Sequence, residues 1–347
     1  MQIKKLLCFS LVLLMLTLCG CKEKEAPKNI NESIVSNSAP VVDEVQQMYK
    51  ELLPADWQRE IDYINIVKKG KFTFAVQTDT HFEGSNEEVG TNLNNLSNTI
   101  ELSFIAHLGD VIRGYSDPQI DSPSNMRSCM DEIVKRYTQD ANCAVMMTVG
   151  NHDANSMWYN EFGDFTGIIT EKEHYNRIIE PLKEHNGERM VNNVESIYHY
   201  IDFPEYKIRA IMLNTVDSKF SLGETSTFNI SKEQIEWFKT QALNTDYSVL
   251  VMMHTPLVDK FEKNNAVNNA QQILDAVESF IADGGDFIAY FCGHIHTQET
   301  VIDDNGRIHM SFRMGGDHAE IVMIDTEKRE INTVGLGDVK MRSKIVY

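Results

Sequence analysis

The chain has 347 residues, of which 42% are hydrophobic and 24% are charged. This balance is typical of a soluble globular protein with one large or two ordinary domains. Its formal net charge of −19 argues against a nucleic-acid-binding surface, because a phosphate backbone requires clustered Lys and Arg. The same charge repels anionic substrates from a distance, so cations at the site itself would have to attract them.

The first twenty residues have the layout of a signal peptide. Lys4 and Lys5 precede an apolar run over 6–18, which is too short to span a bilayer comfortably, and Cys19-Gly20-Cys21 follows. This segment resembles a bacterial lipoprotein signal, which implies that residues 1–20 are removed and that Cys21 is lipidated. A residue smaller than Cys19 is more usual there, and an ordinary secretory signal is the alternative. We expect an extracytoplasmic, membrane-anchored lipoprotein, in the periplasm or at the cell surface.

Three cysteines remain beyond Cys21, namely Cys129, Cys143 and Cys292. Cys129 and Cys143 could form a disulfide outside the cytoplasm. Alternatively, all three are buried free thiols, which is the reading that we favour. Cys292 lies inside an apolar run, so packing explains it better than chemistry does.

Residues 21–43 are rich in polar residues and Pro, and they predict a disordered tether. The remainder, 44–347, alternates strand-like and helix-like stretches and predicts an α/β domain. Late strands are expected at 310–314 and 320–324, a capping box at Ser231 to Gln234 begins one helix, and a second helix covers 269–282. Apolar runs typical of strands buried on both faces cover 72–77, 103–108, 144–149, 209–213, 248–253 and 287–292.

Five of these runs end in residues that bind metals well. In α/β domains ligands gather where strands end and loops begin, so we expect the five loops to meet. Carboxylates can bridge hard cations, and imidazole suits Zn, Fe and Mn. Two adjacent cations usually clamp a phosphoryl group and activate a water. The blocks are Asp79-Thr80-His81, Gly109-Asp110, Gly150-Asn151-His152-Asp153, His254 and Gly293-His294-Ile295-His296.

This ordered set resembles the signature of the calcineurin-like metallophosphoesterase superfamily, which reads D-x-H, G-D, G-N-H-[DE], H and G-H-x-H. The resemblance covers most of the globular part of the chain. It implies an α/β fold of two mixed sheets that form a β-sandwich flanked by helices. The active site is then expected at the carboxyl ends of the strands.

Carried over block by block, the resemblance implies two metal sites that share Asp110. His152 would be a general acid rather than a ligand, and Asp153 would orient its imidazole if the turn folds that side chain back. A positioned imidazole typically adds about 100- to 10,000-fold to the rate. One metal would be held by Asp79, His81, Asp110 and His296, and the other by Asp110, Asn151, His254 and His294.

The chain departs from two branches of this superfamily. Asp110 is followed by Val111-Ile112-Arg113-Gly114, so the x-x-D-R-G continuation of the protein phosphatases is missing. Arg113 also occupies the position at which purple acid phosphatases place a tyrosine. Arg113 could contact a substrate phosphate, or it could form a surface salt bridge.

The resemblance implies hydrolysis of a small phosphoester, monoester or diester, by two divalent ions (Mn, Fe or Zn) with a metal-activated hydroxide. The long polar segment 154–198 would form a lid or an insert, in which Trp158 and Tyr159 could stack on substrate or cap the core. One alternative is a non-catalytic surface binding protein, although no ligand position is lost. A binuclear hydrolase of a non-phosphate bond is the other.

Overall fold

The computed structural model describes residues 40–86, 88–114, 122–217, 228–261, 267–337 and 342–347. The predicted signal, Cys21 and the tether up to residue 39 lie outside the described residues. Two compact units are distinguished, Met1–Val41 and Val42–Tyr347, and both sheets belong to the second. Within the described residues, no helix is long and apolar enough to cross a membrane.

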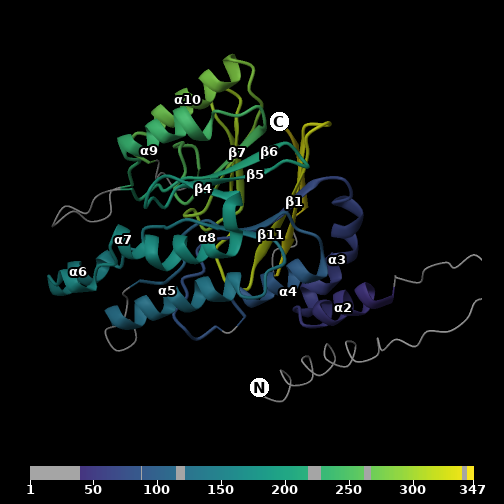
Figure 1. The fold of residues 1–347 in the computed structure, drawn as a ribbon, viewed down its shortest axis with the longest axis horizontal. Coiled ribbons are helices and arrows are strands. Elements are labelled where there is room, and N and C mark those ends of the chain that lie inside the picture. Colours follow the sequence, from purple (N-terminus) through teal and green to yellow (C-terminus); the bar gives the residue numbers. More distant parts are fainter. Residues whose placement is uncertain (1–39, 87, 115–121, 218–227, 262–266, 338–341) are drawn as a thin grey trace, which may run out of the picture. The chain divides into compact units, whose positions relative to one another are not determined.

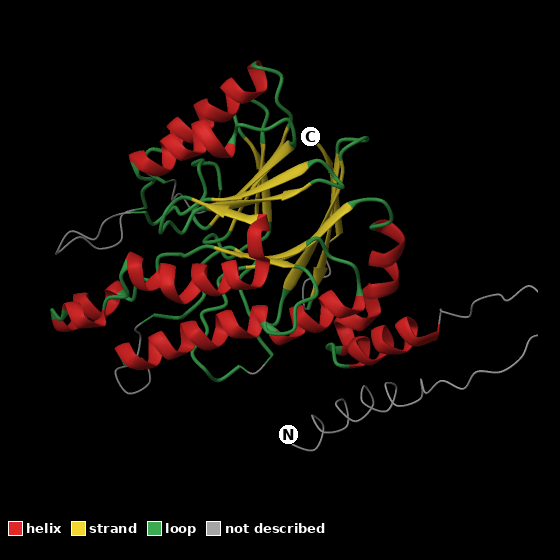
Figure 2. Ribbon diagram, in the orientation of Figure 1, coloured by secondary structure: helices red, strands yellow, loops and turns green. Residues whose placement is uncertain are grey.

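Two mixed sheets form the centre of the second unit, which confirms the predicted fold class (Figure 2). In the first sheet, β1, β2 and β3 run parallel, and β11, β12 and β13 continue it in antiparallel fashion beyond β1. Its order is β13 (Arg342–Val346), β12 (Glu330–Leu336), β11 (Ala319–Asp325), β1 (Phe72–Gln77), β2 (Phe104–His107) and β3 (Ala144–Met147).

The second sheet has four parallel strands at its centre, β6, β7, β8 and β10, with antiparallel strands at both edges. Its order is β4 (Met190–Asn192), β5 (His199–Phe203), β6 (Ile208–Met212), β7 (Ser248–Met253), β8 (Phe287–Cys292), β10 (Ile308–Ser311) and β9 (Glu299–Ile302).

Apolar residues of the two sheets pack against each other. Phe74 stacks on Phe104 of the neighbouring strand at 4.5 Å between ring centroids, and its ring meets Phe291 of the second sheet at 5.7 Å. In β7, Leu250 and Met252 join this central core, while Val249 and Val251 face a second core. This alternation, with both sets buried, explains why the strand is an uninterrupted apolar run.

Helices cover the outer faces of both sheets (Figure 1). The second core lies between sheet two and two elements, α9 with its π-helical continuation η4 and α10. The helices are α2 (Pro40–Glu51), α3 (Ala55–Val67), α4 (Thr91–Thr99), α5 (Pro123–Thr138), α6 (Ser156–Phe162), α7 (Glu171–His174), α8 (Glu180–Asn186), α9 (Lys232–Trp237) and α10 (Ala270–Ala282), with short turns η1 (Phe165–Gly167), η2 (Tyr175–Ile179), η3 (Gly187–Arg189) and η4 (Phe238–Ala242).

The six predicted apolar runs all form strands, and three of them match to the residue: β1, β7 and β8. The late strand expected at 310–314 instead ends at Ser311. After this residue the chain leaves the second sheet. Phe312 N still donates to Cys292 O after β8, but Gly315 N donates to Thr78 O, which follows β1 of the first sheet. Cys129, Cys143 and Cys292 are buried thiols outside any disulfide, as favoured from the sequence.

The capping box at Ser231 is only half correct. Ser231 Oγ accepts from Gln234 N at 3.2 Å, so Ser231 is the N-cap of α9. The Gln234 side chain does not return to the Ser231 N–H. It donates to Asn214 O and to Asp217 Oδ2, and Asp217 accepts from Ser231 N in its place. Asp217, in the connection between β6 and α9, therefore accepts the hydrogen bond that a capping box would assign to the Gln234 side chain.

Candidate metal centre

Six of the seven predicted metal ligands lie in two overlapping groups that share Asp110. The first group contains Asp79, His81, Asp110 and His296, and the second contains Asp110, His254 and His294. Within each group the potential ligand atoms lie within 4.8 Å of one another. These residues follow β1, β2, β7 and β8 directly, so the carboxyl ends of strands from both sheets meet here.

The shared carboxylate of Asp110 lies between the two groups. Its Oδ2 is 3.3 Å from His254 Nε2 and 3.7 Å from His81 Nε2. Asp79 Oδ1 is 3.1 Å from His296 Nε2. The seventh predicted ligand, Asn151, lies beside the second group, with its Oδ1 3.1 Å from His254 Nε2.

The backbone of this site is strained. Five of the predicted ligands have left-handed backbone angles, although none is a glycine: φ is 51° at Asp79, 46° at His81, 50° at Asp110 and 65° at both His294 and His296. Such conformations cost of order 1–2 kcal/mol for each L-residue and are typical of functional sites. The sharp turn after each strand aims the side chain back over the sheet edge.

Gly293 lets the β8 loop approach the β1 loop. A Cβ at this position would collide with Thr78 Oγ1 and would lie 2.8 Å from Asp79 Oδ2. The close approach allows His294 N to donate to Asp79 Oδ2 at 3.0 Å. Thr78 Oγ1 donates to the same oxygen at 2.7 Å. Both donors hold Asp79 so that its other oxygen, Oδ1, faces the cluster.

The two buried carboxylates favour their charged forms. Burial opposes ionisation, but the imidazoles of His296 and His81 hold the pKa of Asp79 well below its usual range. Burial likewise opposes ionisation of Asp110, whose pKa the charge of His254 lowers. In return, Asp110 raises the pKa of His254 to about 9 against the effect of burial. Without metal ions, protons on imidazoles provide the positive charge that these carboxylates require.

Several polar atoms of the cluster lack a hydrogen-bond partner. Asp79 Oδ1, His81 Nε2 and His294 Nε2 are buried and accept or donate no hydrogen bond among the described residues. Buried polar atoms are normally paired, so a group of unpaired ones is typical of a site that binds a ligand. Carboxylate oxygens and imidazole nitrogens are ligands that Mn, Fe and Zn accept. The residues present therefore fit a pair of metal ions.

Two histidines are oriented by backbone carbonyls. His254 Nδ1 lies 2.8 Å from Leu108 O, and His152 Nδ1 lies 2.7 Å from Arg113 O. Each Nδ1 therefore carries a hydrogen and donates it, which directs Nε2 toward the cluster. His152 belongs to neither ligand group, and its Nε2 lies 3.9 Å from Asp110 Oδ2. Its ring lies next to that of His81, with 4.5 Å between the centroids.

Asp153 does not orient His152, which corrects the role expected from the sequence. Its Oδ1 accepts from Ile112 N at 3.0 Å, and its Oδ2 accepts from Gly150 N at 2.7 Å. Asp153 is fully buried and joins the loop after β2 to the loop after β3. The carbonyl of Arg113 orients the imidazole instead, because the turn points the Asp153 carboxylate away from the ring and into these two amides.

A buried histidine, His107, supports the loops that carry two of the predicted ligands. His107 is neutral, because burial lowers its pKa to about 3. Its Nδ1 accepts from Gly109 N, and its Nε2 lies 3.0 Å from Thr80 Oγ1, which donates to Val111 O. It is a hydrogen-bonded core histidine that connects the loops carrying Asp79 and Asp110.

Two arginines near the site, Arg113 and Arg313, compare differently with the sequence analysis. Arg113 forms an ion pair with Glu83, the surface salt bridge that was the alternative to a substrate contact. Arg313 was overlooked. It is exposed on the 312–315 crossing, in which Phe312 N donates to Cys292 O and Gly315 N donates to Thr78 O, so the crossing connects the ends of β8 and β1. A charged residue at the end of a strand-like run was the available signal.

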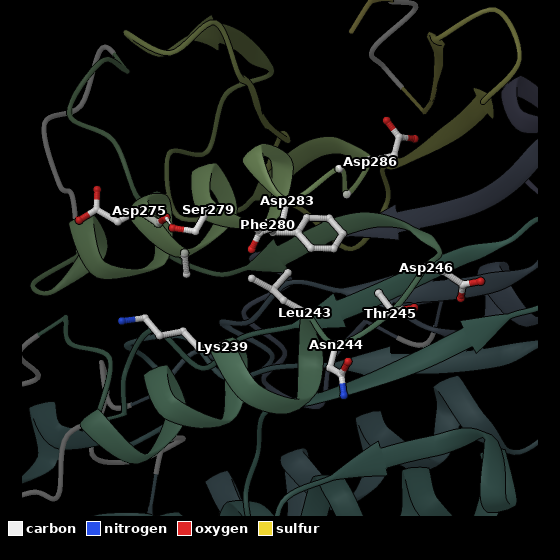
Figure 3. A pocket seen from close by; sticks show the side chains of 13 residues that line it. Lys239, Leu243, Asn244, Thr245, Asp246, Asp275, Ser279, Phe280, Asp283 and Asp286 are labelled. Carbon is white, nitrogen blue, oxygen red and sulfur yellow. Dashed lines mark hydrogen bonds between the residues drawn. The ribbon is translucent and has the colours of Figure 1, made fainter.

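A hollow at some distance from this site lies at the other end of the second sheet. About 740 Å³ in volume, it is lined by residues of η4 and α10 and by the segments that precede β7 and β8 (Figure 3). Leu243 and Phe280 point into it, and Asp246 and Asp286 lie at its edge (Figure 3). It therefore lies at the amino ends of strands whose carboxyl ends lead to His254 and His294.

The chain is similar to proteins of known structure. Among solved structures, a dimetal phosphatase from Danio rerio matches with a TM-score of 0.55 and 13% identity, over 80% of this chain and 99% of that one. A 5'-nucleotidase from Candida albicans matches with a TM-score of 0.48 and 16% identity, over 76% of this chain and 51% of that one. No curated protein sequence matches significantly.

The family model for calcineurin-like phosphoesterases matches residues 72–298, which is more than half of the chain and includes all five sequence blocks. The chain belongs to the calcineurin-like phosphoesterase family.

Proposed function

We propose that the protein hydrolyses a small phosphoester with the help of two divalent cations, either Mn, Fe or Zn. The observation that carries this proposal is the position of Asp110 in both ligand groups, which suits a carboxylate that bridges two ions. Bound there, such cations would neutralise phosphoryl oxygens and lower the pKa of a water at neutral pH. Asp79, His81, Asp110 and His296 would hold one ion, and Asp110, Asn151, His254 and His294 the other.

His152 is the proposed general acid. Arg113 O accepts from Nδ1, which leaves Nε2 as the nitrogen that gives its proton to the leaving-group oxygen. The His152 backbone N–H donates to Asp110 Oδ1 at 2.7 Å. This hydrogen bond fixes the position of His152 relative to the proposed bridging carboxylate. Asp153 would act only by positioning these loops.

The rim residues would bind the substrate. Arg313 is a cation well placed to attract a phosphate in a chain of net charge −19. Phe228 packs edge-on against His294, at 4.8 Å between ring centroids, and would contact an apolar part of the substrate. Arg113 would contribute only if its pair with Glu83 opened.

The lid suggested by the sequence would be limited to residues 156–167. Tyr175, Ile178, Ile179 and Leu182 of the longer segment are part of the central core, so that part is not free to open. In contrast, Met157, Phe162 and Phe165 are exposed. Trp158 packs on Phe162, and Tyr159 stacks on Phe165 at 4.1 Å. These aromatic pairs follow His152 closely in sequence and would contact the leaving group.

We further propose that Cys21 is lipidated and that the domain acts outside the cytoplasm, on the basis of the sequence of residues 1–21. Membrane fractionation after metabolic labelling with a palmitate analogue tests this proposal. The label and the membrane association should both disappear in Cys21→Ala. A wild-type protein without label would reject lipidation and leave the secretory signal as the alternative.

The catalytic proposal is tested with bis-p-nitrophenyl phosphate and p-nitrophenyl phosphate in the presence of Mn²⁺, together with elemental analysis of the purified protein. We expect about two metal equivalents and turnover of one or both compounds. Full metal occupancy without phosphoester turnover would favour the surface binding protein. Turnover of carboxylic esters or amides in a parallel panel, without phosphoesters, would favour a different hydrolase.

A further inference from the structure

A second hollow, of about 400 Å³, lies at the opposite edge of the first sheet from the metal centre. Its wall is formed by the segments that precede β1, β2 and β3 and by the turn between β5 and β6. β1 has six residues, so the hollow is roughly 20 Å from the loop of Asp79. A molecule bound here could not contact the metal centre.

The charge of this hollow is opposite to that of the chain. Four cationic side chains, Lys68, Lys69, Lys71 and Arg189, line it, and they outnumber the two carboxylates, Glu101 and Glu205. The whole chain carries a formal charge of −19. At physiological ionic strength charges more than about 8 Å away are largely screened, so an anion inside the hollow responds mainly to these six groups.

Most of this positive charge is not neutralised by neighbours. Lys68 approaches Glu101 at 3.7 Å, and its side chain is only 16% exposed. Within the described ranges, Lys69, Lys71 and Arg189 form no ion pair. The C-terminal end of α3 accounts for a lysine at its C-cap, Lys68, because cations are favourable there. It does not account for Arg189, which enters the same hollow from η3.

Neutral hydrogen-bond donors complete the wall. The amides of Asn65 and Asn142 and the hydroxyls of Ser103 and Tyr206 line the hollow together with the cations. Lysine ammonium groups bind phosphate as compact point charges, and Arg adds a planar pair of donors that matches two phosphate oxygens. A tetrahedral oxyanion with several acceptor oxygens satisfies this mixture of charge and donors better than a carboxylate or a halide does.

We propose that this hollow is a second anion site, which binds a phosphate group at the edge of the first sheet remote from the metal centre. The group is either inorganic phosphate or a phosphate carried by a lipid headgroup. This inference does not depend on the proposed hydrolysis, because the two sites share no residue.

The test measures the reactivity of individual lysines toward an amine-acylating reagent, read by mass spectrometry on the full-length protein. The local readout keeps phosphate bound at the metal centre from contributing to the signal. With inorganic phosphate at about ten times the dissociation constant, acylation of Lys69 and Lys71 should fall about tenfold, because only the unliganded fraction reacts. Lys183 and Lys232, which are exposed on α8 and α9, should not change.

Sodium chloride at matched ionic strength is the control for simple screening. Protection by phosphate that sodium chloride reproduces, or protection that extends equally to Lys183 and Lys232, would overturn the proposal. In Arg189→Gln, which removes a cation that is not itself probed, protection should weaken at the same phosphate concentration. Unchanged protection of both lysines in this variant would also contradict the assigned site.

A second arm distinguishes the two sources of phosphate. Vesicles of phosphatidylglycerol and of phosphatidylcholine are added in turn, in the absence of inorganic phosphate. Protection of Lys69 and Lys71 by the anionic vesicles alone, without an effect of inorganic phosphate, would assign the site to a lipid headgroup. Protection by free phosphate alone would assign it to the soluble ion. Protection by neither would refute the anion site.

Discussion

The two edges of the sheets differ in how their residues are held. Beyond the carboxyl ends of β1, β2 and β8, five predicted ligands that are not glycines have left-handed backbones, and buried polar atoms lack hydrogen-bond partners. At the amino ends, hollows of about 740 and 400 Å³ are lined by a mixture of exposed, half-buried and buried side chains. Volume alone therefore does not identify the catalytic edge. What distinguishes this edge is that left-handed backbones and unpaired buried groups coincide there on residues that can bind metals.

The largest effect that we expect from a single change at the strained edge is that of Asp110→Asn. The variant should lose both metal ions, and turnover should fall about a thousandfold or more, since several kcal/mol of charge stabilisation would disappear. Elemental analysis and phosphoester turnover measure the two effects. Asp217→Asn, a buried carboxylate between β6 and α9, is the control and should retain the metals. Unaltered metal content in Asp110→Asn would reject the bridging role.

The comparison can be sharpened with two histidines, one at each edge. His152→Ala should keep its metal content but lose about 100- to 10,000-fold in turnover, because the leaving group would no longer receive a proton. His185, whose Nε2 lies 2.8 Å from Cys143 O near the amino ends, is the matched position. His185→Ala should leave turnover nearly unchanged. If His152→Ala runs at the parental rate, the general-acid assignment fails.

Two glycines test whether the strained edge tolerates added volume. Gly293→Ala would push a methyl group into Thr78 and Asp79, and we expect metal affinity to fall about 10- to 100-fold, as for other losses of ligand support. Gly284, at φ 95°, would have no atom within 4 Å of an added methyl group, so Gly284→Ala should cost only about 1–2 kcal/mol of unfolding free energy. Metal titration measures the effect of Gly293→Ala, and urea unfolding measures that of Gly284→Ala. Equal metal affinity in both variants would contradict the close approach of Gly293 to Thr78 and Asp79.

The last effect concerns the pH dependence of stability. Burial raises the pKa of Glu320, on β11 near the carboxyl end of β1, to about 8 from the usual 4.5. Between these values the folded state retains a proton that the unfolded chain releases. The unfolding free energy should therefore fall as pH rises through this window, by up to about 1.4 kcal/mol per unit.

Glu320→Gln should flatten that slope, and urea unfolding at several pH values measures it. Glu330→Gln is the matched control, because Glu330 lies at the other edge of the same sheet, where Lys344 pairs with it at 2.7 Å. An equal slope in wild type and Glu320→Gln would show that Glu320 is not the group responsible.

Much of the fold and of the site could be predicted because the relevant signals are local. A strand buried on both faces must be apolar throughout, so the runs that became β1, β7 and β8 were recognisable residue by residue. The ligand blocks follow such runs directly, and parallel strands bring their carboxyl ends to one edge. The expected grouping of Asp79 with His296 follows from this rule, although 217 positions separate them.

By itself, the sequence determined which side chains gather and at which end of the strands, because burial of apolar runs and the polarity of the chain decide both. Only the tertiary structure decided how each one is used. Asp153 binds two backbone amides, Gln234 turns to Asn214 and Asp217, and Arg313 lies on a crossing between the sheets. These outcomes depend on which unpaired donor or acceptor lies within about 3 Å after packing, and no local pattern encodes a partner that comes from a different loop.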